Sequence, residues 1–171
     1  MLNHWLYELE TSFIIHRPPA WHANIRKQVV KAPKLHFIDS GLACYLLGIH
    51  EPEQLRHHPL RGPIFESWVV SELYKTQLHN GEQPNMYHYR ESRGVEIDLL
   101  IDRGEYLHAI EVKSGATASS DFFKQFRDLP AKLRNTRLPQ DIRNHVVYGG
   151  VDSLQRSQGR LVSWHDVTGI L

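Results

Sequence analysis

Apolar residues recur at helical spacing within residues 1–10, which predicts a short amphipathic helix at the start of the chain. Residues 13–16 follow as a short predicted strand that ends before two prolines. A second short strand is predicted over residues 35–38. Asp39 or Ser40 can then cap a helix that runs to residue 47 and ends at a glycine. The helix of residues 1–10 and the strand of residues 13–16 have no obvious partner, which suggests that the start of the chain is an appendage.

The strongest helical pattern covers residues 64–79, where apolar side chains form one stripe and an Asn-Gly pair follows. A proline- and histidine-rich connection, residues 51–63, precedes it. Glu66 lies in line with Val70 and Leu73 on this helix, so its carboxylate is predicted to lie near the edge of the core.

The second half of the chain alternates strand patterns with a helical one. Strands are predicted at 87–91, 95–102, 105–113, 145–148 and 161–164, and a helix capped at 119–121 is predicted to stop at Pro130. This order of helix, three strands, helix and two strands indicates an α/β (α+β) domain.

Composition narrows the class of protein. At 171 residues, with 41% hydrophobic and 23% charged residues, the chain can bury a full core and is not of a disordered type. The net charge of +1 gives no support for nucleic-acid binding, so any basic surface would have to be local. Cys44 is the only cysteine, which excludes an internal disulfide and fits a reducing cytosol. We expect a cytoplasmic protein, because no apolar run is long enough to cross a bilayer and the start lacks a basic leader.

Two common kinds of site are not predicted. No zinc-binding spacing of His or Cys occurs, and no G-x-x-x-x-G-K-[ST] motif is present, so we expect no zinc site and no ATP site of that type. Basic residues gather between 25 and 34, and they suit either a solvated loop or a phosphate contact. They are Arg26, Lys27, Lys31 and Lys34.

Charged residues concentrate on the predicted hairpin of residues 95–102 and 105–113. A two-residue turn at Arg103-Gly104 would pair Ile97 with Ile110 and make Asp98 a diagonal neighbour of Glu111, roughly 7–8 Å away. In strict alternation Asp98 would share a face with Leu100 and not with Leu99. Lys113 would project from the face of Glu111, whereas a three-residue turn would slip the register and separate the two acids.

This grouping has a chemical use. Asp98, Glu111 and the carbonyl of Val112 could supply hard oxygen ligands for Mg²⁺ or Mn²⁺, and Glu66 could complete the shell. Lys113 could hold an attacking water or offset charge that develops on a phosphate. Spacing leaves a second reading open, in which Asp98, Glu111 and Lys113, with Glu96, form a cross-strand ladder of charges on an exposed face.

Four blocks of the sequence carry a family resemblance. They are KAPKLHFIDSGLACYLLGI, GPIFESWVVSEL, YHYRESRGVEIDLLI and AIEVKSG. In this order they resemble the C-terminal domain of bacterial and archaeal AAA-type ATPases, a domain of unknown function in the restriction-endonuclease-like superfamily. The resemblance runs from about Trp5 to Leu129. It implies a mixed central sheet flanked by helices over 35–171, with 1–34 as the end of a winged-helix-like or linker segment.

The resemblance also assigns roles by position. It implies that Asp98 is the first motif acid, that Glu111 and Lys113 form the Glu-x-Lys pair, and that Glu66 is the acid of the preceding helix. Gln125 matches the helix glutamine of some related nucleases, although a polar rim position is the simpler interpretation.

Two functions remain as hypotheses. The first is a Mg²⁺-dependent nuclease acting on DNA, with Arg90 and Arg93 contacting phosphates unless they are ordinary surface arginines. The second is a catalytically silent module that binds nucleic acid or a partner and regulates an ATPase of that family. The expected partners are DNA and an ATPase or a second copy of the chain. ATP hydrolysis is not expected.

Overall fold

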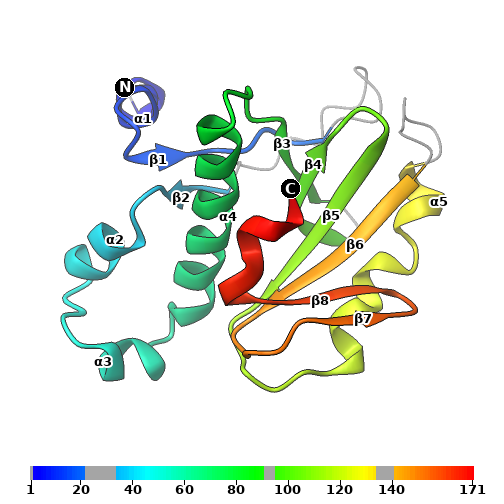
Figure 1. Cartoon of the computed structure of the whole chain (residues 1–171). Helices are drawn as coiled ribbons and strands as arrows, with labels where there is room; N and C mark the ends of the chain where they lie inside the picture. Colours follow the sequence, from blue (N-terminus) through cyan, green and yellow to red (C-terminus); the bar gives the residue numbers. More distant parts are fainter. Residues whose placement is uncertain (1, 22–33, 91–94, 134–140) are drawn as a thin grey trace.

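A six-stranded mixed sheet forms the centre of the protein (Figure 1). The computed structural model describes residues 2–21, 34–90, 95–133 and 141–171. The strands lie in the order β3-β4-β5-β6-β8-β7. Their bounds are β3 Met86–Arg90, β4 Glu96–Asp102, β5 Tyr106–Lys113, β6 Asp141–Tyr148, β7 Leu154–Arg156 and β8 Gly159–Ser163. The predicted α/β (α+β) architecture, a mixed sheet flanked by helices, is confirmed.

The sheet combines an antiparallel half and a parallel half. Strands β3, β4 and β5 form an antiparallel meander, β6 and β8 run parallel to β5, and β7 closes the edge antiparallel to β8. The crossover from β5 to β6 contains the 3₁₀ helix η1 (Ser120–Phe126) and the helix α5 (Leu129–Leu133). Because a parallel connection has to cross the sheet, this segment covers one face.

The two faces of the sheet have separate hydrophobic layers. The long helix α4 (Arg61–His79) and the C-terminal 3₁₀ helix η2 (Trp164–Ile170) pack on one face, with Val69, Val70 and Leu73 of α4 fully buried. Phe123 and Phe126 of η1, together with α5, pack on the other face. The predicted helix over 64–79 is therefore confirmed, with three more residues at its start.

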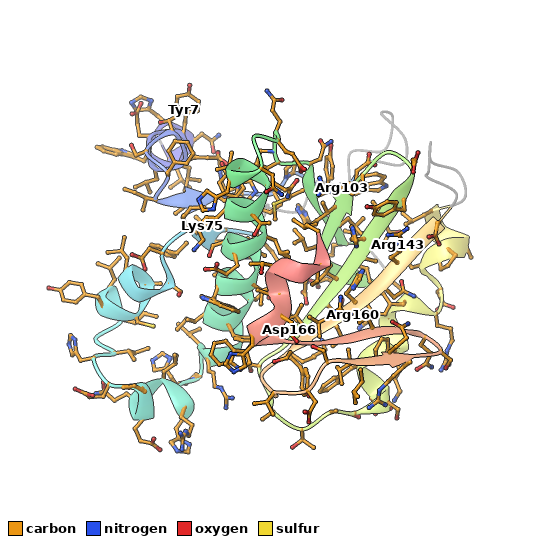
Figure 2. All side chains as sticks on the ribbon, in the orientation of Figure 1. Tyr7, Lys75, Arg103, Arg143, Arg160 and Asp166 are labelled. Carbon is orange, nitrogen blue, oxygen red and sulfur yellow. The ribbon has the colours of Figure 1, made fainter. Side chains whose placement is uncertain are left out.

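The N-terminal part stands beside this core (Figure 1). It consists of α1 (Leu2–Thr11), a two-stranded antiparallel ribbon of β1 (Ile15–His16) and β2 (His36–Phe37), and the helices α2 (Ser40–Leu46) and α3 (Pro52–Arg56). None of the residues of α1 is buried, and Figure 2 shows Tyr7 on this outlying helix. The predicted helical appendage is confirmed, whereas its boundary at residue 34 stays a prediction.

Several local predictions are wrong for identifiable reasons. Residues 51–63 contain α3, which begins with a reciprocal capping box between Glu51 and Gln54. Pro130 does not stop a helix but lies in the first turn of α5, where its missing N–H costs nothing. The short strand β7 and the helix η2 were not predicted, because both depend on tertiary contacts, β7 with β8 and η2 with the layer of α4.

The β4–β5 hairpin has a register two residues away from the predicted one. Leu99 pairs with Ile110, where the turn prediction had paired Ile97 with that residue. A shift of two residues does not by itself exchange the faces of the strands, since strand side chains alternate with a period of two. In this register Asp98 and Glu111 are no longer diagonal neighbours but occupy the two positions next to the paired Leu99 and Ile110.

The turn itself explains this shift. Arg103 donates its N–H to the carbonyl of Tyr106, so the two central residues are Gly104 and Glu105. Gly104 has a φ of 78°, a left-handed value that two-residue hairpin turns require at their first central position. The side chain of Asp102 accepts the N–H of Gly104 at 2.8 Å and fixes the same turn.

A β-bulge interrupts the pairing of β3 with β4. Tyr87 lies opposite Leu100, whereas Tyr89 lies opposite Ile97. One residue of β3 therefore faces two residues of β4, which is the pattern of a bulge.

The bulge changes the face on which the acid lies. Ile97 and Leu100 pack in the layer of η1 and α5, although they are three residues apart. Between them, Leu99 packs in the layer of α4, and Asp98 shares an ion-pair partner with Glu66 of α4. The predicted strict alternation, which separated Asp98 from Leu99, is wrong here because the extra residue breaks the period.

Candidate functional site

Three carboxylates from two elements surround one lysine. The Nζ atom of Lys34 lies 2.7 Å from Oδ1 of Asp98, 2.8 Å from Oε1 of Glu66 and 2.9 Å from Oε1 of Glu96. Lys34 lies two residues before β2, Glu66 comes from the second turn of α4, and the other two acids come from the start of β4. We call these three acids together with Glu111 the acidic cluster.

A second ion pair lies on the neighbouring strand. Lys113 Nζ is 2.9 Å from Oε2 of Glu111, which is only 3% exposed. Val112 lies between Glu111 and Lys113, and its backbone N–H donates to Oδ2 of Asp98 at 3.0 Å. The structure thus brings the predicted Asp98, Glu111, Lys113 and Glu66 into one region.

Burial and mutual repulsion act on the acids. The pKa of Glu111 rises to about 7, first because of burial and then because of the charge of Asp98, although the bond from Lys113 opposes the rise. The pKa of Glu66 is also raised, again by burial and then by Asp98, against the effect of Lys34. Burial and the neighbouring charge of Asp98 therefore both favour the protonated form of Glu66 and of Glu111.

The two lysines remain cationic. Burial alone would lower the pKa of Lys34, but the charges and hydrogen bonds of Asp98 and Glu66 raise it above its ordinary value. The pKa of Lys113 is likewise raised, because its bond to Glu111 and that carboxylate's charge outweigh burial. Lys113 is therefore a charged hydrogen-bond donor at neutral pH and not a base.

The other predicted site residues have different positions. Arg90 lies at the rim of the acidic cluster, with Nε 3.3 Å from Oε2 of Glu96. Gln125 is exposed on η1, whose buried phenylalanines pack on the face of the sheet opposite α4, so the structure does not bring it to the cluster. Arg93 lies outside the described residues, as do Arg26, Lys27 and Lys31.

Lys34 is the site residue that sequence reasoning missed. It was grouped with a basic segment suited to a solvated loop or a phosphate contact, yet it makes the three contacts above. The sequence does hold one signal, because the predicted site has more carboxylates than Lys113 alone can neutralise. Residue spacing does not identify Lys34 as the second cation, because it lies 64 positions from Asp98 in the sequence.

Oxygen ligands of the kind that Mg²⁺ prefers are present, but a lysine stands among them. Across residues 2–21, 34–90, 95–133 and 141–171, no group of three His, Cys, Asp or Glu side chains is arranged to hold a metal ion. The ammonium nevertheless marks a point that three carboxylate oxygens reach at 2.7–2.9 Å. Mg²⁺ takes oxygens at about 2.0–2.1 Å, so the donor chemistry fits the ion while the spacing fits an ammonium.

A cavity of about 440 Å³ adjoins the end of β5. Ser114, which follows Lys113, lines it together with Phe65, Trp68 and Trp164. Arg61 also lines it and donates to the carbonyl of Ser114 at 2.6 Å. The cavity therefore combines aromatic walls with a cationic group.

Among the residues described, no helix has the length and apolar character needed to cross a membrane.

Comparisons with known proteins find relatives that match part of this chain. The uncharacterized protein Rv2008c of Mycobacterium tuberculosis and the uncharacterized protein Mb2031c of Mycobacterium bovis are each 28% identical over 115 residues. That alignment covers 67% of this chain and 25% of each relative, so the chain spans about a quarter of their length. Protein VC1899 from Vibrio cholerae superposes with a TM-score of 0.41 at 14% identity, over 99% of this chain and 40% of that one.

Two family models match separate parts of the chain. Residues 1–53 match a domain of unknown function, DUF8612. Residues 61–167, which include α4, the sheet, Asp98, Glu111 and Lys113, match the domain of unknown function DUF4143. Since that second match covers more than half of its length, the chain belongs to the DUF4143 family.

Proposed function

We propose that this chain hydrolyses phosphodiester bonds in DNA with Mg²⁺ or Mn²⁺, as a restriction-endonuclease-like domain of an AAA-type ATPase family protein. One observation carries the proposal. Asp98, Glu111, Lys113 and Glu66 come from three elements and gather in one region with partly buried ion pairs. Burial first, and then the charge of Asp98, raise the pKa of Glu66 and of Glu111. Perturbed carboxylates of this kind are typical of functional sites and would gain from a divalent cation.

Each residue has a distinct role in this proposal. Asp98 and Glu111 would hold the ion, and Glu66 would complete its shell. The bound ion would supply an activated water and a Lewis acid. Lys113 is charged and partly exposed, so it would donate a hydrogen bond to a phosphate oxygen and offset the negative charge of the transition state.

Two neighbouring features suit a nucleic-acid substrate. Arg90 at the rim of the cluster could contact a backbone phosphate. Phe65, Trp68 and Trp164 in the adjoining cavity could stack on a base, with Arg61 beside them. Binding at these groups would place the scissile phosphate near Lys113.

A specific observation favours the second candidate function. Lys34 makes contacts with three acids of the cluster, so these acids could form a structural ion-pair network without any metal. The domain would then be a silent module that binds nucleic acid or a partner and regulates an ATPase. Its partner could be a separate ATPase or further domains such as the longer relatives have room for.

Calorimetric titration of Mg²⁺ and Mn²⁺ tests the first proposal against the second. We expect heat of binding in the wild type and none in Asp98→Ala. Equal, negligible heats in both proteins would remove the metal hypothesis and leave the silent module. Cleavage of single- and double-stranded DNA, with Lys113→Ala as the inactive control, then separates catalysis from binding.

A further inference from the structure

We propose that Lys34 is an internal competitor for the divalent cation, so that an ion enters the acidic cluster only when the ammonium leaves it. Lys34 would then set the affinity and the threshold concentration of the ion. This inference rests on the proposed function, since it assumes that the cluster binds a divalent cation.

The contacts of Lys34 leave no room for a second cation at the same oxygens. An ammonium has three N–H donors, and Nζ has one carboxylate oxygen within 2.9 Å for each of them. A divalent ion bound to any two of these oxygens would lie within a few ångströms of the ammonium. Repulsion at that distance is large in a partly buried site.

Asp98 forces the choice between the two cations. Its Oδ1 atom lies 2.7 Å from Nζ of Lys34, and its Oδ2 atom accepts the N–H of Val112. Each oxygen has a second lone pair, so hydrogen bonding alone does not block an ion. An ion at Oδ1 would instead lie beside the ammonium, and the repulsion between the two cations favours departure of the lysine side chain.

Lys113 does not compete with the ion in the way that Lys34 does. Its ion-pair partner among the described residues is Glu111, and 36% of its side chain is exposed. Lys113 can therefore stay beside a bound ion and face the substrate, whereas Lys34 cannot. The two lysines have different functions although both neutralise the same cluster.

Removal of the ammonium should change metal binding and stability in opposite directions. In Lys34→Met, the acids of the cluster lose their shared counter-ion and repel one another, so the melting temperature without divalent ions falls. Mg²⁺ then binds without competition. We expect its Kd to fall at least tenfold and its addition to raise the melting temperature more than in the wild type.

The experiment compares four proteins by calorimetry with Mg²⁺ and by thermal melting at constant ionic strength. Lys75→Met is the matched control, because Lys75 pairs with Glu72 on α4 and points away from the sheet (Figure 2). It should leave the Kd unchanged. The double variant Lys34→Met/Glu96→Gln removes one positive and one negative charge. It should remain folded if Lys34→Met alone does not, and it should still bind Mg²⁺ more tightly than the wild type.

The outcomes are distinguishable. An unchanged or weaker affinity in both Lys34 variants, with binding in the wild type, overturns the competition and leaves the metal site intact. Absence of binding in all four proteins overturns the proposed function and this inference with it.

Discussion

The backbone N–H of Val112 donates a 3.0 Å hydrogen bond to Oδ2 of Asp98, and this bond links the two acid-bearing strands. It holds the carboxylate of Asp98 close to Glu111, on the next strand. The charge of Asp98 is the second cause, after burial, of the raised pKa of Glu111. The hydrogen bond that positions Asp98 therefore also contributes to the raised pKa of Glu111.

Removing the charge of Asp98 should lower the pKa of Glu111. Asp98→Asn keeps an oxygen that can accept the N–H of Val112 but carries no charge, so the pKa of Glu111 should fall below its value of about 7. Carbon-detected NMR titration of the Glu111 carboxyl measures this shift. Asp102→Asn, a change in the hairpin turn, is the control and should leave that pKa unchanged. An unaltered value in Asp98→Asn would mean that burial alone raises it.

The raised pKa of Glu111 also predicts a change of stability with pH. Its pKa is about 7 in the folded chain and 4.5 in an unfolded one, so the folded state holds the proton more tightly. The stabilising contribution is complete below about pH 4.5 and is lost as the pH rises through about 7. Glu111→Gln removes this loss and should be more stable than the wild type at pH 8 by on the order of 2–3 kcal/mol.

Urea unfolding at pH 4.5, 6 and 8 measures that difference. The difference should nearly vanish at pH 4.5, where Glu111 is protonated in the folded state and half protonated in the unfolded one. Glu105→Gln, at an exposed position of the hairpin turn, should follow the wild type throughout. A constant offset of Glu111→Gln at all three pH values would contradict the prediction.

The buried pair of His108 and His145 predicts the opposite response to acid. Burial first, and then positive neighbours that include Arg143, lower the pKa of His108 to about 4 and that of His145 to about 3. Their stabilising contribution is complete above about pH 6.5 and is lost as the pH falls toward those values. His145→Asn should therefore lose about 2 kcal/mol less than the wild type between pH 6.5 and 4.5.

Chemical unfolding across that range, with the exposed His57 changed to Asn as control, checks the effect. His57→Asn should retain the full loss of stability in acid. If His145→Asn retained it as well, the acid sensitivity would belong to other groups, such as His36, whose pKa is also lowered to about 4.

The hairpin turn yields a prediction about the backbone alone. Gly104 has a φ of 78°, and no atom would lie within 4 Å of an added Cβ, so an alanine there meets strain without a clash. Gly104→Ala should cost about 1–2 kcal/mol. Gly115→Ala is the matched control, because that glycine also has open space around it but no positive φ, and it should be near neutral. Equal effects in the denaturation midpoints would mean that the left-handed backbone at Gly104 adds no cost for an alanine.

The sequence predicts the elements better than it predicts their alignment. The α4 helix and the strands of the hairpin follow from local periodicity, which the printed sequence contains. The predicted register was wrong because it took Arg103-Gly104 as the central pair of the turn. Gly104-Glu105 contains the same glycine and is the pair that the structure uses. Lys34 could not be placed, since its contacts with α4 and β4 are set by tertiary packing and not by spacing.

The sequence correctly predicted that the candidate site residues lie together, but part of the geometric argument was wrong. The expected diagonal of Asp98 and Glu111 rested on unbroken alternation, whereas the bulge and the shifted turn produce the observed arrangement. The family resemblance named Asp98, Glu111, Lys113 and Glu66 without any such geometry. Whether these residues bind a metal and cleave DNA stays a proposal.

The bulge between Tyr87 and Tyr89 has a consequence for the evolution of this hairpin. The additional residue lies on β4, where Asp98 and Leu99 together face one residue of β3. If either were deleted, ordinary alternation would keep Ile97 and Leu100 in the layer of η1 and α5, with one side chain between them on the side of α4. That position could carry the acid or the core leucine but not both, so a single deletion would remove one of them while the rest of the strand kept its faces.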